Sequence, residues 1–467
     1  MIVCLSLVLL LIFVVRVSSW MRRSVRVKRV VAFFHPYCNA GGGGERVLWC
    51  ALRTLQQRCD SSEFHIVVYT GDVDASGTEI LSRAKERFGI ELDTDRVEFV
   101  FLKWRCLVEA ALYPVFTLLF QSLGGFCLGV EALWRLCPDV FIDSMGYPFS
   151  LPLFRYLAGA AVGCYVHYPV ISTDMLDVVA SRKSAYNNAS AVSRSSFLSY
   201  IKLIYYKLFA KLYGWAGRAS SVCLVNSTWT KEHIVQIWGV RPSVVYPPCA
   251  VDSFCSLAIE SERIMEKEIR VLSVGQIRPE KDHRLQMLSF YKLRELCKPS
   301  VASKLKLVIA GSCRDQRDEK RVEGLVEYAD QLGISEAVIW RLNIPFEELL
   351  SELSRALIGL HTMWNEHFGI GVVEGLAAGN IMVAHRSGGP KLDILTSLDD
   401  RSPVGFLAES ADDYAERMLA IIDLSTSERQ QIRSAARLRA QQFSEERFCD
   451  HFFRSCVGVL LTRAAPE

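Results

Sequence analysis

Short runs of β-branched and aromatic residues alternate along the chain with segments of helical periodicity. This alternation is typical of βαβ units, in which parallel strands are joined by helices that cover both faces of a sheet. The sequence therefore predicts an α/β fold with two doubly wound, Rossmann-like domains. The predicted strands are 30–34, 65–69, 97–101, 140–143, 163–166 and 221–225 in the first domain, and 270–274, 305–310, 337–340, 358–361 and 381–384 in the second.

The two predicted sheets are separated near residue 250. Tyr246-Pro247-Pro248 is a proline step that a helix does not cross, and residues 250–268 show little periodicity. We therefore expect a first domain at 28–250 and a second at 251–443. Ligands of doubly wound sheets bind beyond the carboxyl ends of the strands, so with two facing domains we expect the site in the cleft between them.

An uncharged apolar run opens the chain. Residues 1–15 carry no charge, and five basic residues follow between Arg22 and Arg29. About 20 apolar residues span a bilayer, a length that this run reaches if Arg16 snorkels toward the interface. We interpret residues 1–21 as a transmembrane anchor with the body of the protein in the cytosol. The alternative, a cleaved signal peptide, has its positive charge before the apolar run.

Two further segments have the composition of membrane-interacting helices. Residues 106–136 are apolar but are interrupted by Pro114 and by the Gly124-Gly125 pair, which favours two short helices lying in the interface over a second span. Residues 200–216 place three lysines among aromatic and leucine residues, a pattern typical of helices that lie in lipid headgroups. An ordinary amphipathic core helix is the alternative for residues 200–216.

Composition narrows the class of protein. Of 467 residues, 50% are hydrophobic and 22% charged, with 54 basic and 51 acidic side chains and a formal charge of +3. These values exclude a disordered tail protein and give no support for nucleic-acid binding, which requires a clustered basic surface. The 15 cysteines include no C-x-x-C pair, so we expect reduced thiols. Because we expect the body of the protein in the cytosol, the glycosylation sequons of Asn188 and Asn226 would be chance matches.

The first motif with chemical content is HPYCNAGGGGERV at residues 35–47, directly after the first predicted strand. Gly43 and Gly44 allow a ligand to approach the backbone closely, and the following helix N-terminus offers N–H groups to an anion. The motif has neither the G-x-G-x-x-G spacing of a dinucleotide site nor the Lys of a P-loop. We interpret it as a contact with a donor phosphate or with the acceptor, and a flexible turn is the alternative.

The second motif follows the first strand of the second domain. Arg278 and Lys281 are three residues apart on a tight turn that enters a helix. Both cations can therefore bind one diphosphate, Arg as a bidentate hydrogen-bond donor and Lys as a point charge. Two unrelated surface cations are the alternative.

The third motif is NEHFGIGVVE at residues 365–374, in which seven residues separate Glu366 from Glu374. A helix beginning near Gly369 would place Glu374 about one and a half turns in, with Glu366 on the preceding loop. One carboxylate suits the paired hydroxyls of a ribose, and the other suits sugar hydroxyls or a developing oxocarbenium charge. Solvated surface glutamates are the alternative for either residue alone.

Together these motifs resemble the GT-B family of retaining glycosyltransferases, glycosyltransferase family 4, which includes sucrose-phosphate synthase and bacterial mannosyltransferases. Three stretches resemble more narrowly its eukaryotic branch that acts on dolichol-diphosphate-linked oligosaccharides: HPYCNAGGGGERVLW at 35–49, YVHYP at 165–169 and HTMWNEHFGIGVVEGLAAG at 361–379. The resemblance covers roughly residues 30–443. It also implies that residues 444–467 form a helix returning to the first domain.

The resemblance implies a reaction and its partners. The donor would be GDP-mannose, and the acceptor dolichol-diphosphate-linked trimannosyl chitobiose, which would receive its fourth and fifth mannoses in α-1,2 linkage during N-glycan assembly. The location would be the cytosolic face of the endoplasmic reticulum membrane, with the lipid bilayer and other glycosyltransferases of the pathway as partners and no nucleic acid. No metal or other cofactor would be required.

The resemblance also assigns roles to residues. Arg278 and Lys281 would bind the diphosphate, Glu374 the ribose, and Glu366 would be the catalytic carboxylate beside the transferred mannose. His167 would touch the sugar from the first domain. The remaining donor-binding residues would be Gly43, Gly44, Phe368, Gly369 and Ile370. In the implied front-face displacement, the acceptor 2-hydroxyl attacks on the side from which GDP leaves, and an oxygen of the leaving group takes the proton.

Several alternatives remain open. Another GT-B transferase with a different sugar nucleotide or lipid acceptor would carry the same motifs, and so would a non-catalytic nucleotide-sugar-binding subunit of a glycosylation complex. A dehydrogenase is disfavoured because no G-x-G-x-x-G follows a strand. The D-x-D strings at residues 72–74 and 93–95, typical of metal-dependent GT-A transferases, fall in the first domain, and we interpret them as solvated loop acids.

Overall fold

The computed structural model describes residues 15–19, 21, 26–175, 196–397 and 403–464. Most of the predicted anchor at 1–21 and the sequon at Asn188 therefore lie outside the described residues. The chain forms two compact units: the first runs to Tyr246 and resumes at Phe448, and the second spans Pro247–Arg447. The boundary coincides with the proline step, four residues before the predicted position.

The first unit is built on a parallel sheet of seven strands in the order β3-β2-β1-β4-β5-β6-β7. Its strands are β1 (Arg29–Phe34), β2 (Phe64–Thr70), β3 (Val97–Phe101), β4 (Val140–Asp143), β5 (Ala161–Val166), β6 (Val222–Val225) and β7 (Ser243–Val244). The order reverses between β1 and β4, as in doubly wound folds. Consequently the carboxyl ends of β1, β4 and β5 lie next to one another.

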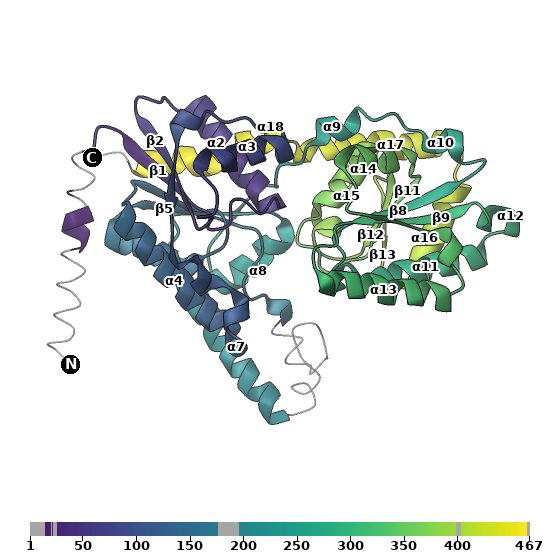
Figure 1. The fold of residues 1–467 in the computed structure, drawn as a ribbon, viewed down its shortest axis with the longest axis horizontal. Coiled ribbons are helices and arrows are strands. Elements are labelled where there is room, and N and C mark those ends of the chain that lie inside the picture. The colour runs from purple at the N-terminus through teal and green to yellow at the C-terminus, as the bar shows by residue number, and fades with distance from the viewer. Residues whose placement is uncertain (1–14, 20, 22–25, 176–195, 398–402, 465–467) are drawn as a thin grey trace. The chain divides into compact units, whose positions relative to one another are not determined.

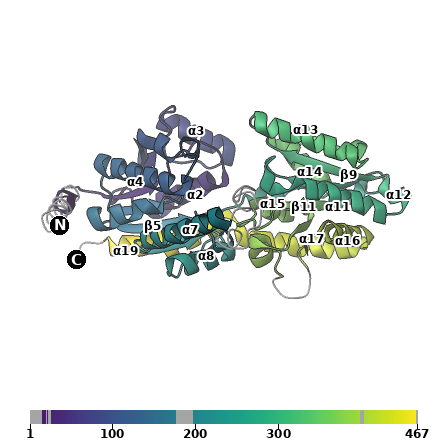
Figure 2. The same ribbon diagram turned by 90° about the horizontal axis from the view of Figure 1, so that it is seen from below.

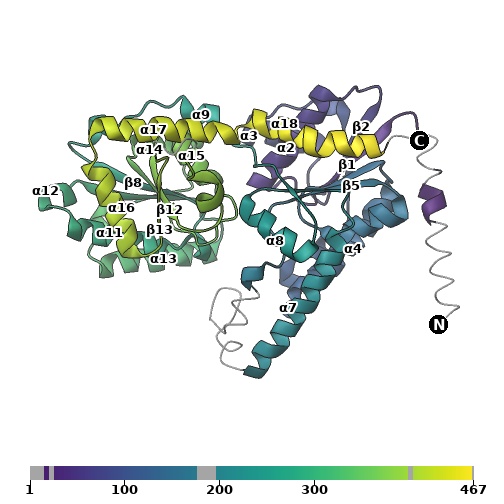
Figure 3. The ribbon, with the colours of Figure 1, turned by 180° about the vertical axis from the view of Figure 1, so that it is seen from behind.

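Helices cover both faces of the first sheet (Figures 1 and 3). One face packs against α2 (Gly43–Arg58), α3 (Gly77–Phe88), α18 (Glu445–Phe452) and α19 (Gly458–Arg463). The other packs against α4 (Thr117–Arg135), α7 (Ser196–Gly217) and α8 (Thr228–Trp238). The C-terminal helices thus complete the core of the first unit, with Phe448 and Phe452 buried in it.

The segment around Gly124-Gly125 is one helix, α4, so the prediction of two short helices is wrong. Gly124 does not interrupt the helix, because it serves close packing: a Cβ there would lie 1.9 Å from the carbonyl oxygen of Leu107. Tyr205 of α7 accepts a hydrogen bond from the N–H of Leu119 at 3.1 Å, which joins α7 to the first turn of α4. Among the described residues, α4 is the one helix with the length and hydropathy of a membrane span, and a third of it is buried.

The second unit holds a parallel sheet of six strands in the order β10-β9-β8-β11-β12-β13. The strands are β8 (Ile269–Val274), β9 (Leu305–Gly311), β10 (Val338–Leu342), β11 (Ile358–His361), β12 (Ile381–His385) and β13 (Phe406–Ala408). On one face, α11 (His283–Leu296) lies between α13 (Gln316–Gln331) and α16 (Ala411–Asp423) (Figure 2). The other face carries α14 (Phe346–Arg355), α15 (Ile370–Ala378) and α17 (Thr426–Ala440) (Figure 1). The two parallel, Rossmann-like sheets confirm the predicted α/β class.

Fourteen cysteines lie in the described part of the chain, and all are free thiols. Asn226, the sequon residue that the structure describes, is 6% exposed, and its amide oxygen accepts a hydrogen bond from the Thr230 hydroxyl at 2.7 Å. The amide is therefore engaged inside the fold, in keeping with a chance match.

Candidate functional site

In the second unit, the turn that follows β8 carries the predicted cations. It passes through a short 3₁₀ turn (Pro279–Lys281) into α11, whose first turn is capped by Asp282: its carboxylate accepts from the N–H of Leu285 at 3.2 Å. The hydroxyl of Thr362, just after β11, donates to the carbonyl of Lys281 at 2.7 Å. This bond holds the backbone of the turn against the carboxyl end of the neighbouring strand.

Lys281, His361 and Glu366 meet at this end of the sheet. The ammonium of Lys281 lies 2.6 Å from Oε2 of Glu366, and Nε2 of His361 lies 3.1 Å from the same oxygen. Among the described residues, Oε1 of Glu366 has no hydrogen-bond partner. The carboxylate is therefore held by one oxygen and leaves the other available to a ligand.

The charge state of Glu366 follows from this environment. Burial alone would raise the pKa of its carboxyl, but the hydrogen bond from His361 and the charge of Lys281 outweigh burial and hold the pKa well below its ordinary value. Glu366 is therefore ionised at physiological pH. A fixed negative charge of this kind can accept hydrogen bonds from sugar hydroxyls or stabilise a developing positive charge.

The backbone around Glu366 is fixed by the segment after β12. The hydroxyl of Ser387 accepts from the N–H of Asn365 at 2.8 Å, and the N–H of Gly389 donates to the carbonyl of Glu366 at 2.8 Å. Gly388 has φ +57°, and a Cβ there would lie 2.2 Å from the Glu366 carbonyl oxygen. Only glycine permits this close approach.

Glu374 lies in α15, which begins directly after Gly369 at φ +110°. The first turn of α15 faces the end of β8, because a Cβ on Gly371 would lie 3.8 Å from the carbonyl oxygen of Val274. The helix N-terminus and the turn with Lys281 thus share one edge of the sheet. Arg278, at the start of that turn, pairs with Glu280 at 3.8 Å and is 39% exposed.

Arginines of α17 fix the far end of α15. Arg433 donates to the carbonyl of Gly379 at 3.0 Å, and Arg437 donates to that of Ala377 at 3.1 Å. Arg433 also pairs with Glu262 at 2.6 Å and is almost fully buried. These bonds satisfy carbonyls that a helix C-terminus otherwise leaves unpaired.

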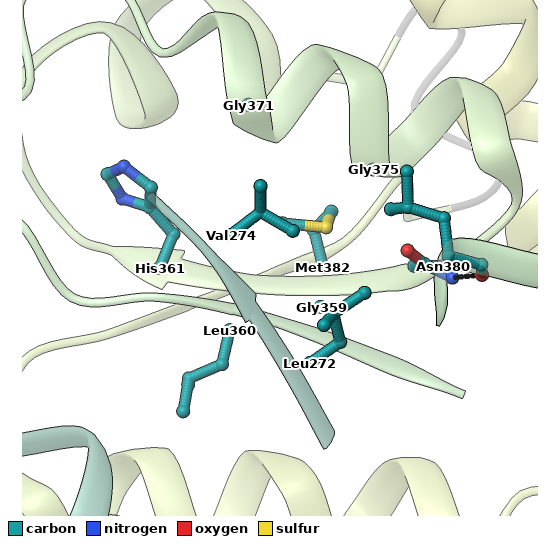
Figure 4. Close-up of a pocket in the computed structure, with 10 residues that line it drawn as sticks. Leu272, Val274, Gly359, Leu360, His361, Gly371, Gly375, Asn380 and Met382 are labelled. Atoms are coloured by element: carbon teal, nitrogen blue, oxygen red, sulfur yellow. Dashed lines mark hydrogen bonds between the residues drawn. The ribbon is translucent and has the colours of Figure 1, made fainter. Parts of the chain in front are cut away.

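A small cavity lies behind the site (Figure 4). Its volume is about 10 Å³, room for at most one water molecule, so it cannot be the donor site. Its lining includes His361, whose Nδ1 is buried and has no hydrogen-bond partner within the described part of the chain.

The first unit gathers a second cluster, at the ends of β1, β4 and β5. Nδ1 of His35 lies 2.9 Å from the hydroxyl of Ser144, and Nε2 of His167 lies 3.0 Å from the Ser144 carbonyl oxygen. Burial, with a smaller contribution from His167, lowers the pKa of His35 from 6.5 to about 3. Burial also lowers the pKa of His167. Both rings are therefore neutral at physiological pH.

The glycine motif reaches this cluster. A Cβ on Gly44 would lie 3.7 Å from Nε2 of His167, so the first turn of α2 lies against that ring. Gly43 is the first residue of α2 and is exposed. The N–H of Gly42 is already bonded to the carboxylate of Glu45 at 2.9 Å, so part of this helix N-terminus is satisfied from within.

One interpretation of the D-x-D strings is wrong. Asp72 is not a solvated acid: it is 7% exposed, pairs with Arg105 and accepts from the N–H of Asn39 at 3.0 Å. Asp93 does lie on the surface, where it accepts from the N–H of Asp95 at 3.0 Å. No group of three or more potential metal ligands occurs among the described residues.

Sequence reasoning did not select His35, Ser144, His361 or Thr362. Each of them is a polar residue at, or one position beyond, the carboxyl end of a buried strand. That position is itself a signal, because ligands of doubly wound sheets bind there.

Comparisons with known proteins agree with this architecture. Residues 28–238 match the family model described as ALG11 mannosyltransferase N-terminus, and residues 257–439 match that of glycosyl transferases group 1. The chain is 52% identical over 461 residues to the GDP-Man:Man(3)GlcNAc(2)-PP-Dol alpha-1,2-mannosyltransferase of Xenopus laevis, covering 97% of this chain and 93% of that protein. It is 53% identical over 421 residues to the Homo sapiens protein of the same name, covering 90% and 85%.

Solved structures share the fold. Alr3699/HepE of Anabaena in complex with UDP and glucose has a TM-score of 0.61 at 15% identity, covering 92% of this chain and all of that one. The α,α-trehalose 6-phosphate synthase of Burkholderia multivorans has a TM-score of 0.65 at 11% identity, covering 93% and 100%. At these identities the likeness shows the fold alone.

Proposed function

Because the chain belongs to the family of ALG11 mannosyltransferases, we propose that it transfers mannose from GDP-mannose to dolichol-diphosphate-linked Man(3)GlcNAc(2) in α-1,2 linkage. Two successive transfers would add the fourth and fifth mannoses of the N-glycan precursor. The geometric observation that carries the proposal is the ionised Glu366, held through one oxygen beside Lys281.

The donor diphosphate binds at the carboxyl edge of the second sheet. Lys281 and Arg278 supply positive charge, and the N-terminus of α15, formed by Phe368, Gly369 and Ile370, supplies backbone N–H groups. Glu374, further along α15, accepts the ribose hydroxyls. These protein charges stabilise the diphosphate, as a metal ion does in metal-dependent transferases. We therefore propose a reaction without a metal cofactor.

The transfer is a front-face displacement. The acceptor 2-hydroxyl forms a bond to C1 of mannose on the face from which GDP leaves, the bond from C1 to the β-phosphate oxygen breaks, and that oxygen takes the hydroxyl proton. Lys281 stabilises the negative charge of the leaving diphosphate, and Glu366 stabilises positive charge on the sugar. His167, whose ring lies beside Gly44, contacts the sugar, and Gly43 and Gly44 contact the donor.

The protein acts at the cytosolic face of the endoplasmic reticulum membrane, anchored by residues 1–21, where its lipid acceptor and other glycosyltransferases of the pathway are its partners. An exposed apolar surface in the first unit supports the bilayer as a partner. On α4 and the preceding residues it comprises Trp104, Leu112, Val115, Phe116, Phe120, Leu123, Phe126 and Trp134, and on α7 Tyr200, Ile201, Ile204, Leu208, Leu212 and Trp215.

Protease added to sealed microsomes should digest the body of the protein, and full protection would place it in the lumen.

Donor and acceptor are tested with the purified protein and lipid-diphosphate-linked Man(3)GlcNAc(2). We expect label from GDP-mannose, and not from UDP-glucose, to appear in products with one and then two added mannoses that an α-1,2-mannosidase removes. Transfer to other lipid-linked glycans only would favour another acceptor. Binding of GDP-mannose without transfer to any acceptor would favour a non-catalytic subunit.

A further inference from the structure

A cavity of about 220 Å³ lies in the first unit, apart from the residues to which a role has been given. Three segments enclose it: the first half of α4, the loop after β4, and the residues just after β5. The lining residues are Leu118, Gln121, Ser122, Gly125, Met145, Gly146, Tyr147, Pro148, Phe149, Tyr168 and Val170, which we call the Tyr168 pocket.

The wall formed by the β4 loop is rigid before any ligand binds. The buried carboxylate of Asp143 accepts three backbone N–H bonds, from Met145 at 3.1 Å, Gly146 at 3.0 Å and Tyr147 at 2.7 Å. The Ser150 hydroxyl donates to the Tyr147 carbonyl at 2.7 Å. Three bonds to one buried carboxylate hold the loop in a single conformation, as in a preorganised binding site.

On the opposite wall, α4 packs closely against the aromatic ring of Tyr147. A Cβ on Gly125 would lie 3.0 Å from Cδ1 of Tyr147, so the absence of a side chain at Gly125 lets the ring lie directly on the helix. Gln121 is fixed in turn, because its amide donates to the carbonyl of Val108 at 2.9 Å. Both walls thus present side chains in defined positions.

The lining indicates the chemistry of the ligand. No charged side chain lines the pocket, which disfavours a diphosphate. Three aromatic rings, from Tyr147, Phe149 and Tyr168, stand beside an amide and hydroxyl groups. Apolar faces with a few polar groups suit a neutral sugar, whose ring has both C–H faces and hydroxyls. The volume is below the ~300–1,000 Å³ of sites for drug-sized ligands and admits about one hexose ring.

The Tyr168 pocket lies next to a residue of the proposed reaction site. Tyr168 directly follows His167, so their Cα atoms are about 3.8 Å apart and the pocket opens beside the residue proposed to contact the transferred sugar. The proposed acceptor carries five sugars on its diphosphate, so other sugars separate the mannose at its growing end from the isoprenoid. When the terminal mannose lies at the reaction site, its nearest neighbour is therefore another sugar and not the lipid.

We propose that the Tyr168 pocket is an acceptor subsite that binds one mannose of the lipid-linked glycan, the residue preceding the mannose whose 2-hydroxyl attacks. This inference rests on the proposed function. The pocket aligns the acceptor by holding a sugar that takes no part in the chemistry. Binding energy from a non-reacting part of a substrate then contributes to its orientation.

The experiment measures steady-state transfer by the full chain with Tyr168→Ala, Tyr168→Phe and Tyr156→Ala. Tyr168 is 57% exposed, so its truncation should leave folding intact; Tyr156, 52% exposed on the same unit and outside the pocket lining, is the matched control. We expect Tyr168→Ala to raise KM for the lipid-linked acceptor at least tenfold and to leave KM for GDP-mannose within twofold. Tyr168→Phe, which keeps the ring, and Tyr156→Ala should both stay near the wild type.

A second arm identifies the occupant. Lipid-free α-1,2- and α-1,3-linked mannotriose should inhibit the wild type competitively against the acceptor and should inhibit Tyr168→Ala at least tenfold less. If instead the wild type discriminates between long and short lipid chains on the same glycan, and Tyr168→Ala loses that discrimination, the pocket holds the isoprenoid and the sugar subsite is refuted. An unchanged acceptor KM in Tyr168→Ala also refutes it. Absence of transfer by the wild type would refute the proposed function itself.

Discussion

Replacing Glu366 with glutamine should separate donor binding from catalysis. The Lys281 ammonium lies 2.6 Å from Oε2 of Glu366, so the carboxylate and a bound diphosphate would share one cation. Glutamine keeps the shape of the side chain but removes its charge. Lys281 is then free to turn toward the diphosphate, and we expect GDP to bind at least as tightly as to the wild type.

The magnitudes follow from the two interactions that change. Loss of a preorganised electrostatic contact in the transition state costs a factor of ~10²–10³ in kcat, and we expect Glu366→Gln to fall in that range. Lys281→Met removes the cation itself. A hydrogen bond to a charged group contributes about 1.5–3 kcal/mol, so GDP should bind roughly 10- to 150-fold more weakly to that variant.

The assay combines calorimetric titration with GDP and steady-state transfer for both variants, at a pH near 7 where Glu366 is ionised. Glu280→Gln is the matched control, because Glu280 is a half-buried glutamate on the same turn, paired with Arg278 at 3.8 Å, and should keep the wild-type kcat. If Glu366→Gln weakens GDP binding as much as Lys281→Met does, or keeps a wild-type kcat, the assigned roles of the pair are wrong.

Substitutions at other positions test the fold around the Glu366 and His35 clusters. Since burial lowers the pKa of His35 from 6.5 to about 3, the unfolded chain binds one more proton between these pH values. From pH 6.5 to pH 5, the free energy of unfolding in guanidinium should therefore fall by about 2 kcal/mol less in His35→Asn than in the wild type, and the loss that remains includes that of His283, whose pKa burial also lowers. Gly388→Ala should lower transfer at least 100-fold because the new Cβ displaces the Glu366 backbone, whereas Gly324→Ala, in open space within α13, should raise the melting temperature slightly. Arg433→Met should destabilise the protein by ~1–3 kcal/mol in thermal unfolding, because the buried carbonyl of Gly379 loses its donor, whereas Glu262 keeps its pair with Arg429.

A hydrophobic run in the sequence identifies a strand whose side chains are buried. The runs at 30–34 and 270–274, for example, fall within β1 and β8. The pattern does not predict β7 and β13, because they contain only two and three residues, too few to show a period. Glycine misled the prediction at α4, where Gly124 provides close contact with Leu107 and not a break.

The candidate site was predictable only in part. The residue types and short spacings indicated Lys281 and Glu366, but their contact joins positions 85 residues apart, and periodicity contains no such information. His361 was missed because a histidine at the end of a strand has no distinctive spacing. The bonds that fix Glu366, from Gly389 and through Ser387, depend on how the loops after β11 and β12 meet, which is a property of the folded sheet.

We propose that this protein transfers mannose with retention and without a metal ion, because its own charged side chains stabilise the leaving diphosphate. The most direct test of this proposal is the product formed by the purified wild type from GDP-mannose and lipid-diphosphate-linked Man(3)GlcNAc(2) in excess EDTA, analysed by NMR for anomeric configuration and by mass for added hexoses. We predict two added mannoses, both α-1,2-linked, at the rate measured without EDTA. A β-linked product would refute retention, and activity that EDTA abolishes and a divalent cation restores would refute metal independence.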